Sequence, residues 1–296
     1  MEKRKFLVLS GRFSVINEVY KTIHAHKSVR KYKKQIVAPE TLNRILEAAT
    51  RASTSGNMQC YSIIVTQDDG MKQQLLAPHF NQSMVTEAPV LLTFCADFNR
   101  MRKWIEISEA PQNFDNFMSF MIASIDAILA SQNAALAAES EGLGICYMGT
   151  TLASCNRIAE ILNCPANVVP VVGFSLGYAD DEAPVRERLP QSAVIHYEKY
   201  HDYTANEIKE HYRAKETSGF KRYTQIPELN ELVEKHGLKN LAQVYTVAKY
   251  TRESHVGYSK TVLKFLKSQN FFEHEIQVTQ NLSQVPKTSH SAQSAR

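Results

Sequence analysis

The sequence FMSFMIASIDAILASQNAALAA, residues 117–138, is the most hydrophobic stretch of the chain. Its length is close to the roughly 20 apolar residues that a membrane-spanning helix needs. Asp126, Gln132 and Asn133 would be costly in lipid, however, and the abundant Ala, Ser and Met suit closely packed soluble helices. A helix that is apolar nearly all round needs burial on every side. We therefore predict a central helix of the domain, or a helix sealed at a subunit interface, and no membrane span.

Short apolar runs before and after this segment are typical of β-strands. The runs at 90–95 and 168–174 are continuous, which indicates strands buried on both faces. Further strands are predicted at 61–66, 145–148 and 193–196. Apolar periodicity and helix start and stop signals predict helices at 15–25, 39–52, 71–76, 153–162, 206–213, 227–235, 241–249 and 259–267. The helices predicted beyond residue 203 are polar and lack a full apolar stripe. Such helices often wrap a partner subunit or form mobile lids.

The overall composition indicates one globular domain with irregular ends. Of the 296 residues 44% are hydrophobic, and a net charge of +4 is too small to indicate nucleic-acid binding without a concentrated basic patch. The five cysteines form no C-x-x-C pair, which argues against a disulfide framework or a zinc site and favours a reducing compartment. The apolar run at 6–9 is too short for a signal peptide. We expect a cytoplasmic protein with an irregular arm at 1–14, a domain at 15–273 and a disordered tail at 274–296.

The peptide His26-Lys27-Ser28-Val29-Arg30 places three cationic or potentially cationic side chains and a hydroxyl within five residues. It lies between two predicted helices, so a turn is expected. Backbone N–H groups, the hydroxyl and the Arg30 fork would suit a phosphate, because charge-assisted and bidentate hydrogen bonds favour that anion. The alternative is a solvated basic stretch that continues as far as Lys34.

Three other stretches are candidates for binding an anion or a heterocycle. Residues 53–59, Ser-Thr-Ser-Gly-Asn-Met-Gln, form a polar loop that could bond a planar heterocycle or a phosphate, or could only connect two elements. Residues 144–151 combine a strand, a glycine turn and a helix start, but their glycine spacing does not fit the G-x-G-x-x-G fingerprint. Arg186 and Arg188 could grip one phosphate together, or could only flank the acidic residues 180–182.

Taken together, four stretches resemble the FMN-dependent nitroreductase superfamily, in particular its NADPH-dependent oxygen-insensitive nitroreductases and flavin reductases. The stretches are His26–Arg30; Arg51–Ser55 with Gln59-Cys60; Phe94–Arg100; and Gly142–Gly149 with the later Arg188-Leu189-Pro190. The likeness covers about residues 19–200 and continues more loosely to about residue 273. One such motif is weak evidence, whereas four in the same order are specific.

The resemblance implies an α+β fold: a nitroreductase-like three-layer sandwich with a mixed, mostly antiparallel sheet flanked by helices, in an intertwined homodimer with FMN at each interface. The cofactor-binding residues that it implies are His26, Lys27, Ser28, Arg30, Ser55, Gln82, Tyr147, Met148, Gly149, Thr150, Arg186 and Arg188. Arg186 and Arg188 would close on the phosphate. Lys27 is the candidate for placing positive charge near N1 and O2 of the flavin ring, where reduction builds negative charge.

The implied activity is hydride transfer from NADPH or NADH, through FMN, to a nitroaromatic, quinone or flavin acceptor in a ping-pong cycle. No catalytic residue or metal is expected, because the flavin carries its own hydride chemistry. Two alternatives remain open: a flavoenzyme of the same fold that performs reductive dehalogenation or flavin fragmentation, and a flavin-binding or redox-sensing protein that is not an enzyme. The sequence does not identify the acceptor or decide between NADPH and NADH.

Overall fold

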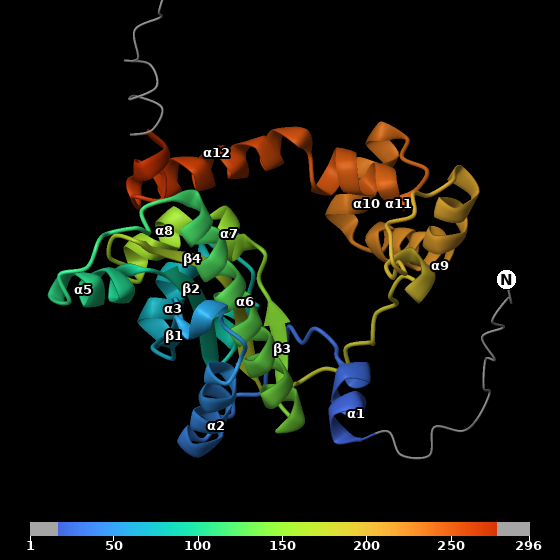
Figure 1. Ribbon diagram of the computed structural model, residues 1–296. Helices are drawn as coiled ribbons and strands as arrows, with labels where there is room; N and C mark the ends of the chain where they lie inside the picture. The colour runs from blue at the N-terminus through green and yellow to red at the C-terminus, as the bar shows by residue number, and fades with distance from the viewer. Residues whose placement is uncertain (1–16, 277–296) are drawn as a thin grey trace, which may run out of the picture.

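The computed structural model describes residues 17–276; the predicted arm at 1–14 and most of the predicted tail at 274–296 lie outside them. A four-stranded sheet with the strand order β1-β2-β4-β3 forms the centre of the described part (Figure 1). Its strands are β1 (Tyr61–Thr66), β2 (Val90–Asp97), β3 (Gly144–Tyr147) and β4 (Val168–Gly177). The three pairings of these strands are antiparallel. An isolated parallel bridge joins Ser28 to Ile145 of β3.

Helices cover both faces of this sheet and complete a three-layer sandwich. On one face lie α2 (Pro39–Thr50) and α6 (Phe117–Ser140); on the other lie α3 (Asp69–Leu76), α4 (Met84–Glu87) and α8 (Cys155–Ile161). Side chains alternate between the two faces along each strand, so Leu92 packs in the core beneath α6 and Leu91 packs with α3 and α4. The predicted α+β sandwich is therefore confirmed.

The hydrophobic segment at 117–138 is the central helix, α6. Its alanines Ala123, Ala127, Ala130 and Ala134 are fully buried, and such small side chains allow close approach to the sheet. Among the described helices only α6 is long and apolar enough to cross a membrane. It contacts α2 and all four strands, however, which makes it the core helix of the sandwich.

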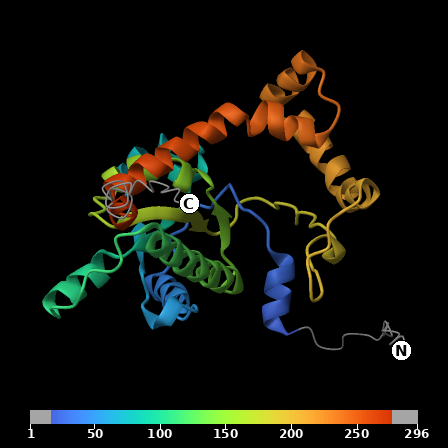
Figure 2. The same cartoon turned by 45° about the horizontal axis from the view of Figure 1, so that its top comes forward.

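Beyond β4 the chain leaves the sandwich and forms a helical excursion, residues 205–249. It consists of α9 (Ala205–Thr224), α10 (Pro227–His236), α11 (Leu241–Gln243) and the π-helix η3 (Val244–Lys249), which share a small core of their own. The next helix, α12 (Arg252–Ser268), returns to α8 and to α7 (Thr150–Ala153). Figures 1 and 2 show the excursion standing away from the sheet, with α1 (Glu18–Ala25) beside β3 and α5 (Asn99–Ile107) projecting from the opposite side.

The strand predicted at 193–196 does not form. A short 3-10 helix, η2 (Gln191–Ala193), stands at its start, and the described sheet has no strand there. Val194 is 60% exposed and Ile195 is 45% exposed. A β-branched composition favours a strand only where a neighbouring strand and a packing surface are available. In this chain the segment has already left the sheet.

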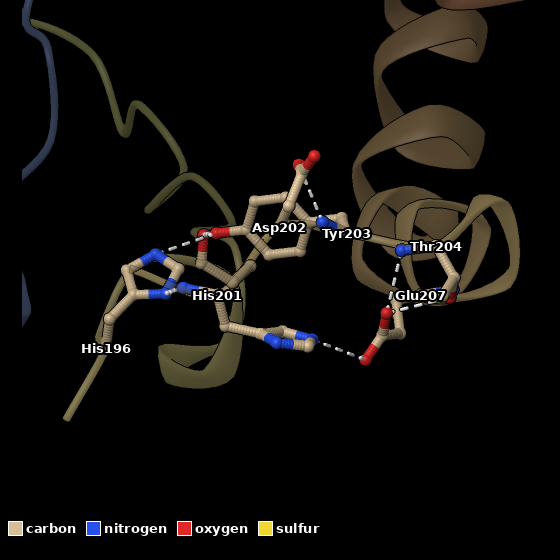
Figure 3. Close-up of polar contacts among 7 residues, drawn as sticks. His196, His201, Asp202, Tyr203, Thr204 and Glu207 are labelled. Carbon is tan, nitrogen blue, oxygen red and sulfur yellow. Dashed lines mark hydrogen bonds and ion pairs between the residues drawn. The ribbon is translucent and has the colours of Figure 1, made fainter. Parts of the chain in front are cut away.

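The connection that leads into α9 is held by a polar cluster around His196 (Figure 3). The Tyr203 hydroxyl donates to the carbonyl of Ala193 at 2.9 Å and lies 3.1 Å from Nε2 of His196. The backbone N–H of His201 donates to Nδ1 of the same ring at 3.2 Å. The Tyr203 hydroxyl donates its proton to Ala193, and Nδ1 of His196 accepts from His201. A neutral His196 ring therefore carries its proton on Nε2 and donates it to the Tyr203 oxygen. The side chain of Glu207 closes the cluster by capping Thr204 at the start of α9.

Replacing Tyr203 by Phe is expected to loosen this connection. The change removes both hydrogen bonds of the hydroxyl, and a partly buried hydrogen bond contributes about 1 kcal/mol. The free energy of local opening should fall by about that amount, so limited proteolysis within residues 190–204 should become several-fold faster. Tyr197→Phe, at an 86% exposed position, is the matched control and should cut at the wild-type rate. Equal cleavage of the two variants would contradict the role assigned to the cluster.

Candidate functional site

His26 is fixed by a hydrogen bond at the end of the central helix. It follows the last residue of α1, and its Nδ1 lies 2.6 Å from Oε1 of Glu139 in the last turn of α6. Burial raises the pKa of the Glu139 carboxyl, while hydrogen bonds from the His26 ring and from the backbone N–H of Lys27 act in the opposite direction. Sequence reasoning missed Glu139. In the sequence Glu139 is only a carboxylate near the end of a largely apolar segment, and its burial leaves no local signal.

A pocket of about 470 Å³ opens beside this hydrogen bond. It is lined by Ile23, His24, His26, Gln132, Leu136, Glu139, Val185, Arg186 and Arg188. The structure therefore brings His26 together with Arg186 and Arg188, as the resemblance implied. The Arg188 guanidinium donates to the carbonyls of Arg186 and Glu187 at 3.1 and 3.3 Å, which limits its orientation. The lining contains one carboxylate, Glu139, which is already paired with His26, and the guanidinium groups of Arg186 and Arg188. Because positive charge is in excess, the pocket suits an anion.

Ser28 and Val29, in the middle of the His26–Arg30 turn, are tied to β3. The N–H of Val29 donates to the carbonyl of Ile145 at 2.9 Å, and Ser28 forms the parallel bridge to the same residue. The approach is close enough that a Cβ at Gly144 would lie 2.4 Å from a methyl carbon of Val29, so only glycine fits there. Lys27 borders a neighbouring pocket of about 280 Å³, and Arg30 is exposed. Lys27, Ser28 and Arg30 thus lie close to the anion pocket without lining it.

Tyr147 ends β3, Met148 and Gly149 connect it to α7, and Thr150 begins α7; the predicted strand at 145–148 is therefore one residue shorter at its end. The side chains of the first two point to opposite sides: the Tyr147 hydroxyl lies 3.1 Å from Oγ of Ser131 on α6, whereas Met148 is buried in the core beneath α3. Gly149 is exposed, and a Cβ at this position would meet no atom within 4 Å. The turn therefore leaves open space over its backbone, which a flat ligand could use.

His79, a residue that sequence reasoning missed, links Gln82 to this turn. His79 is 1% exposed, and its Nδ1 lies 2.8 Å from Oγ1 of Thr150. Gln82 follows one turn later, with its N–H donating to the carbonyl of His79 at 3.3 Å. The buried histidine therefore fixes Thr150 and Gln82 relative to each other.

His79 is expected to make the protein sensitive to acid. Burial lowers the pKa of His79 to about 4, from an ordinary value of 6.5. The unfolded state thus binds the proton more tightly than the folded state. The contribution of the neutral His79 ring to the free energy of unfolding is therefore present above pH 6.5 and is lost as the pH falls through 4. The shift corresponds to about 3 kcal/mol between pH 7 and pH 4. In urea titrations, the free energy of unfolding of His79→Gln should change less between pH 7 and pH 4 than that of the wild type, by roughly that amount. An unchanged pH dependence would contradict the role assigned to His79.

Ser55 lies at a separate place, clamped to the middle of α6. Asp126, 1% exposed, accepts hydrogen bonds from Oγ1 of Thr54 at 2.5 Å, the N–H of Ser55 at 3.0 Å and the N–H of Cys60 at 3.4 Å. The rise of an α-helix places Asp126 roughly 20 Å from Glu139 along α6. One chain therefore does not bring Ser55 to the pocket beside His26. Asp126 appeared in the sequence only as a residue unsuited to lipid.

The loop that carries Ser55 borders a second hollow, of about 490 Å³. Its lining combines Gly56, Asn57, Met58, Gln59 and Cys60 of the loop with Asp97, Arg100, Met101 and Trp104. Trp104 is 61% exposed, so it does not serve as a core residue within one chain. Within residues 17–276 no group of three His, Cys, Asp or Glu side chains is placed to hold a metal ion.

Comparison with known proteins identifies the family of the chain. The nitroreductase family model matches residues 23–178. An FMN reductase (NADPH) of Bacillus subtilis is 36% identical over 190 residues, which cover 62% of this chain and 75% of the relative. An oxidoreductase structure from Bacteroides fragilis matches with a TM-score of 0.77 and 39% identity, over 85% of this chain and 99% of the other.

A second solved structure is the NADPH:FMN oxidoreductase of Vibrio harveyi complexed with NAD+. It matches with a TM-score of 0.63 and 31% identity, over 67% of this chain and 85% of the other. The family model spans more than half of the sequence, and its matched region contains the His26 turn, the Asp126 clamp and the turn after β3. The chain belongs to the nitroreductase family.

Proposed function

We propose that this protein is an FMN-dependent oxidoreductase that passes hydride from NADPH or NADH to a nitroaromatic, quinone or flavin acceptor. The observation that carries the proposal is the pocket in which His26, Arg186 and Arg188 converge in a chain of the nitroreductase family. Relatives of the chain are named FMN reductase (NADPH) and NADPH:FMN oxidoreductase. The predicted activity and cofactor agree with these names.

The pocket beside His26 fits the phosphate of FMN. Arg186 and Arg188 offer planar forks for phosphate oxygens, and the His26 ring is held in place by Glu139. Lys27, Ser28 and Arg30 are at hand in the same turn. In this arrangement the residues at the end of α6 would hold the phosphate, and residues of the turn after β3 would hold the flavin ring.

Residues around that turn are proposed to hold the ring. The exposed backbone at Gly149 gives a flat ligand room. Tyr147 is fixed by a hydrogen bond with Ser131, and Thr150 by a hydrogen bond with His79. Gln82, positioned through His79, would bond the edge of the ring. Bound FMN supplies the hydride chemistry, so these residues orient the ring and exclude water, and Lys27 would place positive charge near N1 and O2.

We also propose that the domain at 15–273 works as a homodimer. One side of α6 and the adjacent α1 carry large apolar side chains that the chain itself leaves exposed: Val19, Tyr20, Met118, Met121, Ile125, Ile128 and Leu129. An exposed apolar surface of this extent is typical of a subunit interface. A second subunit on this surface could bring its own Ser55 to the flavin, which one chain alone does not do. Light scattering should give twice the 33.5 kDa of one chain, and a monomer would contradict the proposal.

The cysteines support placement of the protein in the cytoplasm, because all five are free thiols. The proposed activity is tested by steady-state kinetics with NADPH and a quinone as the two varied substrates. A ping-pong cycle predicts parallel lines in double-reciprocal plots, since the two substrates use the same cleft in turn. Intersecting lines would require both substrates to bind together and would contradict the cycle.

A further inference from the structure

The hollow between the loop after α2 and helix α5 does not belong to the anion pocket at the end of α6. It has a volume of about 490 Å³ and is lined by residues 56–60 of the loop and by Asp97, Arg100, Met101 and Trp104. Arg100 and Met101 lie one helical turn before Trp104 on α5, and residues at this spacing share one face of a helix. One wall of the hollow is therefore the loop, and the other is a single face of α5.

Trp104 gives the second wall a large aromatic surface. It is the only tryptophan of the chain, and it is 61% exposed. Met58 and Met101, which line the same hollow, are partly buried and pack against the main core. Thioether side chains are flexible and polarisable, and they make favourable contacts with aromatic rings. An indole ring beside two methionines suits a planar aromatic ligand.

The loop wall is held in one conformation before any ligand binds. Gly56, Asn57 and Gln59 have φ angles of +55°, +55° and +54°, in the left-handed region that is costly for residues other than glycine. The N–H of Gln59 donates to Oγ1 of Thr54 at 2.9 Å, and Thr54 in turn donates to the buried Asp126. A wall that is already ordered loses little conformational entropy on binding.

The charged groups of this hollow neutralise each other, unlike those of the anion pocket. The Arg100 guanidinium donates to the carbonyls of Gln59 and Tyr61 at 2.6 and 3.0 Å, and it lies 3.6 Å from a carboxylate oxygen of the buried Asp97. The lining thus contains one guanidinium and one carboxylate. A neutral ligand is therefore favoured over a phosphate. The exposed amides of Asn57 and Gln59 can donate hydrogen bonds to its oxygen atoms.

We propose that this hollow binds a neutral, planar, electron-poor aromatic molecule of the quinone or nitroaromatic class, with its ring stacked on Trp104. The face of an indole ring is electron-rich, so an electron-poor ring stacks on it favourably. The quinone or nitro oxygens accept hydrogen bonds from the polar rim. The inference rests on the proposed function, because it identifies a subsite for the acceptor of that reaction. Binding itself requires no electron transfer.

The same loop connects the hollow to the proposed dimer. Ser55 immediately precedes the residues that line the hollow. A second subunit that brings its Ser55 to the flavin would therefore bring this hollow with it. In that arrangement an acceptor stacked on Trp104 of one subunit would be held close to the flavin of the other.

The single tryptophan allows binding to be measured directly. Full-length, FMN-loaded protein is titrated with the quinone menadione in the absence of NADPH, and N-acetyltryptophanamide corrects the emission for light absorbed by the ligand. The expected result is saturable quenching of Trp104 emission. A saturated cyclic diketone, which has the carbonyl groups without the aromatic system, should give no saturable quenching.

Two results of this titration would overturn the proposal. One is quenching that rises linearly with menadione concentration, as it does for the free indole. The other is Trp104 emission that acrylamide does not quench, because a second subunit would then cover the indole ring.

Variants connect the site to turnover. Trp104→Ala should lower kcat/KM for menadione about tenfold, and Trp104→Phe, which keeps a ring, should lower it less. Bleaching of the flavin by NADPH should keep its wild-type rate in both. Ile107→Ala, at an 81% exposed position of α5 outside the hollow, is the matched control and should keep the wild-type kcat/KM. An unchanged kcat/KM in Trp104→Ala, or an equal loss in both half-reactions, would contradict an acceptor subsite at Trp104.

The two readouts separate this inference from the proposed function. If NADPH and NADH both fail to bleach the flavin while menadione still quenches Trp104 saturably, the proposed function is wrong and the hollow remains a binding site. If the flavin is bleached but quenching is not saturable, the proposed function stands and the inference about the hollow is wrong.

Discussion

Replacing Asp126 by Ala is expected to destabilise the protein and to weaken FMN binding together. The carboxylate is 1% exposed and accepts hydrogen bonds from Thr54, Ser55 and Cys60. Its removal leaves these donors unpaired near the core. Each lost hydrogen bond to a charged group costs about 1.5–3 kcal/mol in isolation, and the bonds share one acceptor. We expect the free energy of unfolding to fall by about 3 kcal/mol in urea titrations.

The same substitution also releases the loop that carries Ser55. Because Ser55 is proposed to bond the flavin across the dimer, a loop without its clamp should lower FMN affinity by about tenfold or more. Asp126→Asn retains one accepting oxygen and should lie between Ala and wild type in both measurements. Ser140→Ala, at an exposed position on the same helix, should change stability by less than about 0.5 kcal/mol. If Asp126→Ala were as stable as Ser140→Ala, the clamp would have no energetic role.

Replacing Arg186 or Arg188 by Ala is expected to remove most of the phosphate affinity of the pocket. A hydrogen bond to a charged group contributes about 1.5–3 kcal/mol, so each variant should bind FMN roughly 10–100-fold more weakly. Replacement by Lys keeps the charge but removes the bidentate fork, and it should give a smaller loss. Quenching of FMN fluorescence on binding to the apoprotein measures the affinity directly.

Riboflavin provides the decisive comparison for these two variants, because it lacks the phosphate. If Arg186 and Arg188 bind phosphate, both variants should weaken FMN binding while leaving riboflavin binding nearly unchanged. Arg157→Ala, which breaks an exposed 3.6 Å ion pair with Glu160 on α8, is the matched control and should affect neither ligand. Equal weakening of FMN and riboflavin would show that the arginines act on the fold rather than on the phosphate.

Much of the sandwich was predictable because its elements carry strong local patterns. Residues 117–138 could only be a helix buried on most sides, and α6 begins at Phe117 and ends at Ser140. The continuous apolar runs at 90–95 and 168–174 became β2 and β4, the two central strands. The strand predicted at 193–196 failed because β propensity is realised only against a neighbouring strand, and none lies beside Val194 or Ile195.

The candidate site was predicted less completely, for a physical reason. The motif residues His26, Arg186 and Arg188 could be predicted because their chemistry is visible in the sequence, and the structure brings them to one pocket. Glu139 and His79 were missed because their roles come from contacts with residues far away in the chain. Burial gives these side chains their effect, and burial of a single polar residue has no local signal.

Anaerobic titration of the purified, FMN-loaded protein with NADPH and with NADH tests the central claim most directly. The proposed function predicts that at least one nucleotide bleaches the yellow flavin absorbance at about one equivalent per subunit. A quinone or nitroaromatic added afterwards should restore the colour. Protein that cannot take up FMN, or bound flavin that neither nucleotide bleaches, would contradict the assignment of this chain as an FMN-dependent oxidoreductase.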